Sequence, residues 1–417
     1  MFIKQKIDQY GRFYNDYPRT FWTLMGVSFI DHLGGALMFP FFALYITSKF
    51  NVGMTEVGIL FALFSISSFI GSALGGAMTD RLGRRGMLIF SLVSTSISAV
   101  IMGLVSSLSA FYMFALLVGV FTDVGGPARM AMMADLLPEE KRVSGFGIFR
   151  VVFNIAAAIG PAIGGFMATR SYLALFITDA VLSLITAFLV FRYIPETKPA
   201  ERIDAPRESL ATTFKGYFTV LRDRFFVFYI FASILAGLVY MNFNTTLGVF
   251  LRDYRGIPES GYGLLITINA TMVVFMQFSI SRVIDKYKPM LMMALGTLLS
   301  AMGFALFGFV HTYSLAVVAM VILTIGEMIW APVSNAVVAN FAPEDKRGRY
   351  MAAFGFSWGI PFAVGPLLAG QLLDSGNGDW LWYACGVLGI LGTLCFVALS
   401  RALPPTRLAT RAEANPE

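Results

Sequence analysis

The stretch Gly76-Ala77-Met78-Thr79-Asp80-Arg81-Leu82-Gly83-Arg84-Arg85 separates two long apolar runs. Its Asp80-Arg81 pair recurs 205 residues later as Asp285-Lys286, again between two apolar runs. Pro127 and Pro332 are separated by the same offset, as are several other landmarks. A register kept without a gap from one landmark to the next predicts two structurally equivalent halves with a site between them.

The composition of the chain is that of a protein that lives in lipid. Of its 417 residues, 57% are hydrophobic and 13% are charged, and the mean hydropathy is +0.71. About 20 apolar residues cross the roughly 30 Å hydrocarbon core as a helix. The sequence therefore predicts an all-α membrane protein with twelve transmembrane helices in two pseudo-symmetric six-helix bundles. The expected spans are 20–47, 55–79, 87–106, 109–134, 145–168, 172–193, 225–250, 260–283, 290–310, 313–338, 349–372 and 379–400.

Four segments follow from this pattern. Residues 1–194 form the N-terminal bundle together with its amphipathic lead-in over Met1 to Arg19, and residues 223–403 form the C-terminal bundle. A polar linker over 195–222, with a short surface helix, joins the two bundles. The polar residues 404–417 form a tail.

The distribution of positive charge predicts the orientation. With the N-terminus inside, 25 Lys and Arg residues lie in cytoplasmic segments and four lie on the opposite side. We expect a multi-pass protein of the bacterial inner membrane with both termini in the cytoplasm. The positive residues are spread over seven segments, which argues against a nucleic-acid partner.

Each residue type in the loop between spans two and three has a physical role. Gly76 permits a close helix contact, Asp80 caps a helix end, Gly83 makes a tight turn, and the arginines Arg81, Arg84 and Arg85 face carboxylates and lipid headgroups. At this spacing and position the stretch resembles the loop motif of the major facilitator superfamily. The resemblance covers nearly the whole chain and implies alternating access by two six-helix bundles. It also implies a conformational latch in which Asp135 pairs with Arg84.

Span five carries a second pattern of that superfamily. Gly160, Pro161, Gly164 and Gly165 match a glycine-proline motif of exporters that exchange substrate for protons, although Ala156 replaces its first glycine. Proline removes a backbone hydrogen bond and glycines permit close crossing, so these residues predict a hinge. A purely structural kink is the alternative.

Span four departs from the family pattern. Many proton-coupled members carry an arginine at the position of Ala115, and here Asp123 and Arg129 are the charged residues of that span. The resemblance therefore leaves the usual arginine route of coupling in doubt, and a local acid can take its place.

Charges inside the hydrocarbon are costly, about 2.5–3.5 kcal/mol each on insertion scales, and mark functional sites. Asp31, His32, Asp123 and Glu327 lie midway along spans one, four and ten. The resemblance places these spans around the central cavity, so the four residues are the predicted proton-coupling groups. Asp179, in span six, is expected to be structural.

Other polar and aromatic residues of the spans are candidate substrate contacts. Their alternative roles are helix packing and, for the arginine, neutralisation of Asp31 or Asp123. The candidates are Arg150, Asn154, Tyr240, Asn244, Gln277, Trp330 and Trp358.

These patterns together favour a monomeric proton-coupled exporter of a small hydrophobic or cationic compound, most like the bacterial drug exporters. Enzymatic, metal-binding and phosphate-loop signatures are weak, so we expect no cofactor and the proton motive force as the energy source. Three alternatives remain open. They are a lysolipid or glycolipid flippase in which Arg129 or Arg150 binds headgroups, a proton-coupled sugar or metabolite importer, and a sensor without transport activity.

Overall fold

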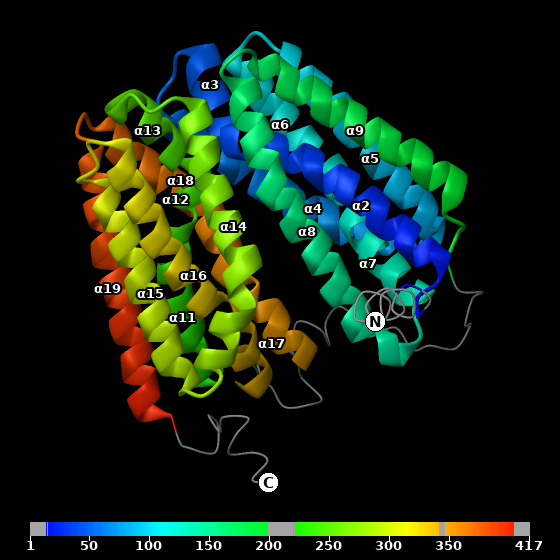
Figure 1. Cartoon of the computed structure of the whole chain (residues 1–417). Helices are drawn as coiled ribbons and strands as arrows, with labels where there is room; N and C mark the ends of the chain where they lie inside the picture. The colour runs from blue at the N-terminus through cyan, green and yellow to red at the C-terminus, as the bar shows by residue number, and fades with distance from the viewer. Residues whose placement is uncertain (1–13, 15, 199–219, 221, 342–346, 404–417) are drawn as a thin grey trace, which may run out of the picture. The chain divides into compact units, whose positions relative to one another are not determined.

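The computed structural model describes residues 14, 16–198, 220, 222–341 and 347–403. Every regular element in these ranges is a helix (Figure 1). Twelve helical spans are long and apolar enough to cross a membrane, which confirms the predicted fold class. The predicted lead-in helix before residue 14, the surface helix of the linker and the tail after residue 403 lie outside the described residues.

The chain forms two compact units. The first comprises residues 1–39 and 66–204, and the second comprises residues 40–65 and 205–417. Residues 40–65 belong by sequence to the N-terminal half, yet they pack within the second unit. The domain boundaries expected from the sequence repeat stay a prediction.

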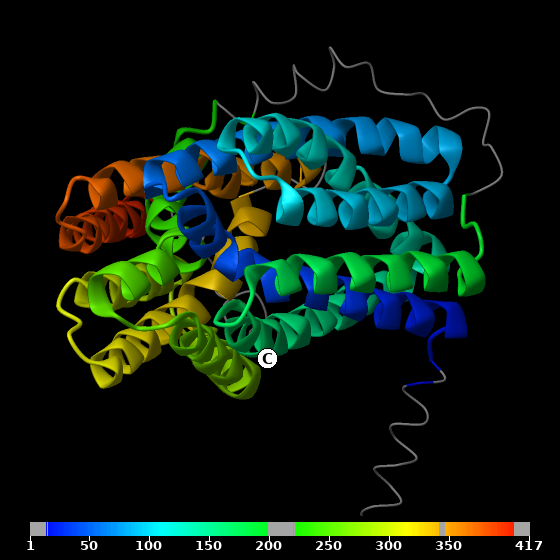
Figure 2. The ribbon, with the colours of Figure 1, turned by 90° about the horizontal axis from the view of Figure 1, so that it is seen from above.

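The first unit contains seven of the labelled helices, α4 entering it from residue 66 onward. In it α9 lies alongside both α2 and α5 (Figures 1 and 2). A buried apolar cluster that includes Phe21, Met87 and Met132 joins α2, α5 and α7. The helices are α2 (Arg19–Met38), α4 (Met54–Leu82), α5 (Arg84–Leu104), α6 (Leu108–Asp123), α7 (Gly125–Leu136), α8 (Glu139–Ala168) and α9 (Tyr172–Tyr193).

The second unit is built around α15, which packs against α16 and α19 (Figure 1). Its core includes Phe226, Tyr229, Phe341 and Phe396. The elements are η1 (Phe39–Phe41), α3 (Phe42–Phe50), α11 (Arg224–Tyr240), α12 (Asn242–Thr245), α13 (Leu247–Arg255), α14 (Glu259–Ile284), α15 (Pro289–Phe307), α16 (Tyr313–Phe341), α17 (Arg347–Phe354), α18 (Phe356–Asp374) and α19 (Asp379–Ala402), with the first residues of α4.

Four of the expected spans are interrupted helices, which the hydropathy pattern does not predict. The eleventh, 349–372, breaks at Gly355 between α17 and α18. Span one breaks at the short 3₁₀ turn that contains Pro40, and span four breaks at Val124. Proline lacks the N–H that continues a helix; Pro127 therefore leaves the carbonyl of Asp123 without its usual partner. Span seven breaks at Met241, next to Asn242, whose side-chain amide donates to the carbonyls of Leu238 and Val239.

Candidate functional site

In the first unit, the charged centre joins α2 to α7. The Arg129 guanidinium donates to Asp31 Oδ2 and forms an ion pair with it. Both side chains are largely buried, at 16% exposure for Asp31 and 13% for Arg129. A buried ion pair is maintained only when its charges compensate each other, so the pair holds Asp31 ionised in this conformation.

His32 completes the charged centre and is an acceptor there. Its Nδ1 lies 3.1 Å from Arg129 Nη1 and 3.7 Å from Asp31 Oδ2. Because a guanidinium can only donate, Nδ1 accepts in its contact with Arg129. The ring packs edge-on against Phe149 and Phe153 of α8.

Asp123 is the last residue of α6, beside the break before α7. Its backbone is described, but its side chain lies outside the described part of the structure. The predicted role of Asp123 in proton coupling therefore stays a prediction.

In the second unit, the buried acid is Glu327 on α16. Tyr240 donates its hydroxyl proton to Glu327 Oε1 at 2.7 Å, and the amide of Asn269 donates to Oε2 at 2.8 Å. The same amide donates to Thr324 Oγ1 at 3.0 Å, which fixes its orientation. Among the described residues no cation pairs with Glu327. Two neutral donors orient this carboxyl without compensating its charge.

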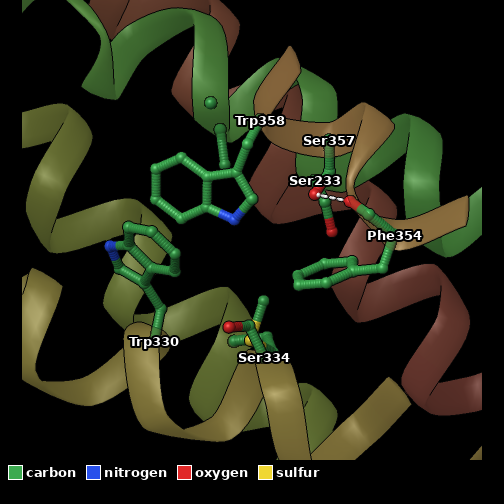
Figure 3. Close-up of a pocket in the computed structure, with 9 residues that line it drawn as sticks. Ser233, Trp330, Ser334, Phe354, Ser357 and Trp358 are labelled. Atoms are coloured by element: carbon green, nitrogen blue, oxygen red, sulfur yellow. Dashed lines mark hydrogen bonds between the residues drawn. The ribbon is translucent and has the colours of Figure 1, made fainter. Parts of the chain in front are cut away.

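Tyr240 is also part of a cluster of three aromatic rings next to Glu327. Tyr240, Trp330 and Trp358 contact one another pairwise, with ring centroids 5.5–6.0 Å apart. Both indoles line a cavity of about 10 Å³, close to the volume that one water needs. Figure 3 shows Phe354, Ser233, Ser334 and Ser357 around the same cavity. Ser357 is tied by its hydroxyl to the Phe354 carbonyl at 2.6 Å.

The remaining candidate substrate contacts are not brought together with these groups by any recorded hydrogen bond. Gln277 binds the Met328 carbonyl at 3.0 Å and Ser281 Oγ at 3.1 Å, so it braces α14 against α16. Arg150 is exposed, whereas Asn154 and Asn244 are half-buried. The guanidinium beside Asp31 is that of Arg129, and no recorded ion pair in the described chain involves Arg150.

The loop between α4 and α5 is held by two carboxylates of its own unit. Arg84 Nε donates to Asp135 Oδ2 at 3.1 Å. Glu196, just after α9, accepts from the backbone N–H groups of Arg84 at 2.8 Å and Arg85 at 3.2 Å. Gly83 has a φ of 97°, and a side chain there would collide with Glu196. Arg85 donates to the Phe191 carbonyl and lies over its ring. The surroundings of Gly76, Asp80 and Arg81 lie outside the described part of the structure.

The predicted hinge is a helix crossing in the structure. α8 continues through Pro161, and Gly160 packs on α2, where an added Cβ would lie 2.5 Å from that of Ala36. Gly164 and Gly165 are also buried. Only glycine allows this separation between α8 and α2.

Two polar contacts at the α3–α4 turn were not predicted from the sequence. Asp374, at the end of α18, accepts from Met54 N at 2.9 Å, Thr55 N at 2.7 Å and Thr55 Oγ1 at 2.6 Å. Arg252 donates to the Leu44 carbonyl at 3.1 Å, Ser48 Oγ at 2.6 Å and Thr47 Oγ1 at 2.9 Å. We call these two sets of bonds the 40–65 clamp, because they tie that segment to the C-terminal half.

Sequence reasoning also missed Asn269 and underrated Arg129. A lone asparagine within an apolar run was the available signal for Asn269, because a buried amide needs partners. Arg129 stood out as a charge in span four, but its partner lies 98 positions away.

Comparison with known proteins agrees with the fold. The sequence profile of the Major Facilitator Superfamily matches residues 24–362 and 229–416. A Na(+), Li(+), K(+)/H(+) antiporter of Planococcus maritimus is 26% identical over 389 residues, covering 87% of this chain and 91% of the relative. The multidrug resistance protein MdtH of Shigella boydii is 25% identical over 91% of this chain and 93% of its own.

Among solved structures, the nucleoside transporter NupG has a TM-score of 0.78 at 14% identity. The match covers 93% of this chain and 100% of NupG, and it shows the shared fold alone. The family and its structural neighbours are transporters of small molecules and not enzymes. By its profile match, its twelve spans and its loop motif, this chain belongs to the Major Facilitator Superfamily.

Proposed function

We propose that the protein exports a small hydrophobic or cationic compound in exchange for protons, and that Glu327 binds a coupling proton. The observation that carries the proposal is the environment of Glu327: a buried carboxyl with two neutral donors and, among the described residues, no cation. An ionised carboxylate there is uncompensated, so a proton or a positively charged substrate is needed to neutralise it. Binding of the one then excludes the other, which is the competition that an antiporter requires.

The aromatic group next to Glu327 supports a cationic or flat apolar substrate. Tyrosine and tryptophan faces attract cations by roughly 0.5–2 kcal/mol each. Two relatives, a monovalent cation/proton antiporter and a multidrug resistance protein, have names that fit the same chemistry. In the first unit Arg129 is paired with Asp31, so of the two arginines that the lipid-flipping alternative offers for a headgroup only Arg150 remains.

We further propose that the protein lies in the bacterial inner membrane with both termini in the cytoplasm, because 25 cationic residues fall in segments on that side and four on the other. A proton brought inward along the membrane potential supplies about 2.3 kcal/mol per 100 mV. One proton in each cycle therefore supports export of a neutral compound against a gradient.

The test uses inside-out vesicles and a dye that reports internal pH. Na⁺, K⁺, Li⁺, ethidium and tetraphenylphosphonium are added to vesicles acidified by respiration. We expect at least one of these cations to release protons, and Glu327→Gln to abolish the release. Glu259→Gln, the same change at the start of α14, is the matched control and should retain it. Proton release that survives in Glu327→Gln would refute the role of Glu327, and the absence of release for every cation in the wild type would refute cation/proton exchange.

A further inference from the structure

Asp179 is an acid inside the first unit that none of the roles above uses. It lies on α9 with 3% of its surface exposed. The residue opposite on α2 is Gly34, where an added Cβ would lie 2.5 Å from Asp179 Oδ1 and 3.5 Å from its Cα. A larger residue at position 34 would push against this carboxyl, so Gly34 and Asp179 pack directly against each other.

The carboxyl of Asp179 has no polar partner within the described part of the chain. Among the described residues, none donates a hydrogen bond to it and none pairs with it. α9 packs against α5, α2 and α8. α5 begins with Arg84 and Arg85 and has no titratable side chain after them. On α8, the charged residue nearest the middle of the helix is Arg150, which is exposed. The charged groups that face Asp179 are therefore those of α2, Asp31 first, with the Arg129 and His32 bound to it.

The charges of that neighbouring group already cancel. Arg129 compensates Asp31, and His32 accepts from Arg129 through Nδ1. Asp179 packs on Gly34, which lies three residues, or about one helical turn, after Asp31 on the same helix. An ionised Asp179 would therefore be an uncompensated charge in an apolar interior, next to another carboxylate. A carboxyl in that position takes up a proton instead.

We propose that Asp179 is a second proton-binding site of this transporter, placed behind the Asp31–Arg129 pair. The carboxyls of Asp31 and Asp179 and the guanidinium of Arg129 together hold one exchangeable proton, which is bound to Asp179. When another positive charge arrives, the O–H bond of Asp179 breaks. The proton then leaves through water or through the Asp31 carboxylate. The role of this proton in transport rests on the proposed proton exchange, whereas its presence on Asp179 does not.

Infrared spectroscopy of the purified protein in lipid vesicles tests the site without any substrate. A protonated carboxyl has a C=O stretch separate from that of a carboxylate and from the amide bands. At neutral pH we expect the difference spectrum of wild type minus Asp179→Asn to show one protonated carboxyl. Asp285→Asn, which changes an exposed acid, should show none. A wild-type spectrum identical to that of Asp179→Asn in this region would overturn the proposal.

A second comparison decides the question even if Asp179→Asn does not fold. Asp31→Asn leaves the Arg129 charge without a carboxylate, which favours ionisation of Asp179 in its place. We therefore compare the Glu327→Gln variant with the Glu327→Gln, Asp31→Asn double variant. Although Asp31→Asn removes an ionised group, we expect it to cause the loss of the protonated-carboxyl band of Asp179. A protonated band that persists in this double variant contradicts the assignment.

Transport measurements separate this inference from the proposed function. In the vesicle assay with Na⁺, K⁺, Li⁺, ethidium or tetraphenylphosphonium, Asp179→Asn should still exchange the cation but move one proton fewer in each cycle. Proton release with the same stoichiometry in this variant would overturn the role of Asp179 and leave the proposed antiport standing. If the wild type shows the protonated-carboxyl band of Asp179 but releases no protons with any cation, the proposed cation/proton exchange is refuted and the assignment of Asp179 as a proton-binding site is retained.

Discussion

At the scale of single residues, Glu196 shows how one carboxylate organises a loop. Partial burial raises its pKa, but hydrogen bonds from the backbone N–H groups of Lys198, Arg84, Arg85 and Thr197 outweigh this effect, and the pKa lies below the ordinary glutamate value. Two of those donors begin α5, where the helix dipole favours a negative charge. Glu196 therefore caps α5 from a position more than a hundred residues along the chain.

This cap predicts a specific pH dependence. Because the folded-state pKa is lowered, the stabilisation is complete above the unfolded pKa of about 4.3 and is lost as the pH falls through the folded value. Glu196→Gln should cost roughly 0.5–1 kcal/mol at neutral pH, the low end of capping effects for a solvent-exposed group. Thermal unfolding in detergent from neutral to acidic pH measures both effects. An equal acid-induced loss in variant and wild type would contradict the assignment.

The sequence allowed individual residues of the candidate sites to be predicted, but not the contacts between them. Asp31 and Glu327 stand out because charge is rare in apolar runs, and the structure places both in polar clusters. Their partners could not be predicted, because Arg129 and Asn269 come from other helices and sequence spacing says nothing about contacts over such distances. Asp179 was expected to be structural since span six was assigned no cavity role, and only its burial without a partner draws attention to it.

At the scale of elements, glycines set the distance between α15 and α16. A Cβ on Gly326 would lie 2.6 Å from the Gly296 carbonyl oxygen, and one on Gly296 would lie 2.7 Å from Trp330 N. These neighbours are backbone atoms, which cannot move aside cheaply. Since Gly326 precedes Glu327, the same crossing positions the buried acid against Tyr240 and Asn269.

Gly326→Ala should therefore destabilise the protein by about 1–3 kcal/mol through overpacking. Gly359→Ala in α18 is the matched control, because nothing lies within 4 Å of its added methyl group and alanine is the better helix former by about 1 kcal/mol. Thermal unfolding of the two purified variants measures the difference. Equal midpoints would show that α15 and α16 separate without cost.

Hydropathy predicted the number and order of the spans, and the structure confirms them. It could not predict that spans one, four, seven and eleven are broken helices, because hydropathy averages over about 19 residues and does not register a single missing hydrogen bond. Proline at 40 and 127 was visible in the sequence, yet Pro161 and Pro332 lie within continuous helices. Whether a proline breaks a helix depends on its neighbours in space.

At the scale of the whole molecule, the 40–65 clamp ties a segment of the N-terminal repeat to the C-terminal repeat. Asp374 accepts three hydrogen bonds at the start of α4, and Gly53 leaves space for its carboxylate. Gly370 brings the backbone of α18 against that of Met54 in the same place. Alternating access requires the two repeats to separate on one side at a time, so these bonds must break once in each cycle on the side that we propose faces outward.

Asp374→Ala should therefore shift the protein toward the conformation in which this end is open. Hydrogen bonds to a charged group contribute about 1.5–3 kcal/mol, so a loss of about 2 kcal/mol multiplies the open-to-closed ratio by about 30. Spin labels on Val52→Cys and Ser375→Cys report it as a longer distance in pulsed electron resonance. Asp379→Ala is the matched control, since its partner Arg255 lies in the same repeat and that bond persists when the repeats part. If both variants give the wild-type distances, the 40–65 clamp does not set the conformational equilibrium. If only Asp374→Ala lengthens the distances, a single carboxylate at the end of α18 decides which side of the transporter is closed at rest.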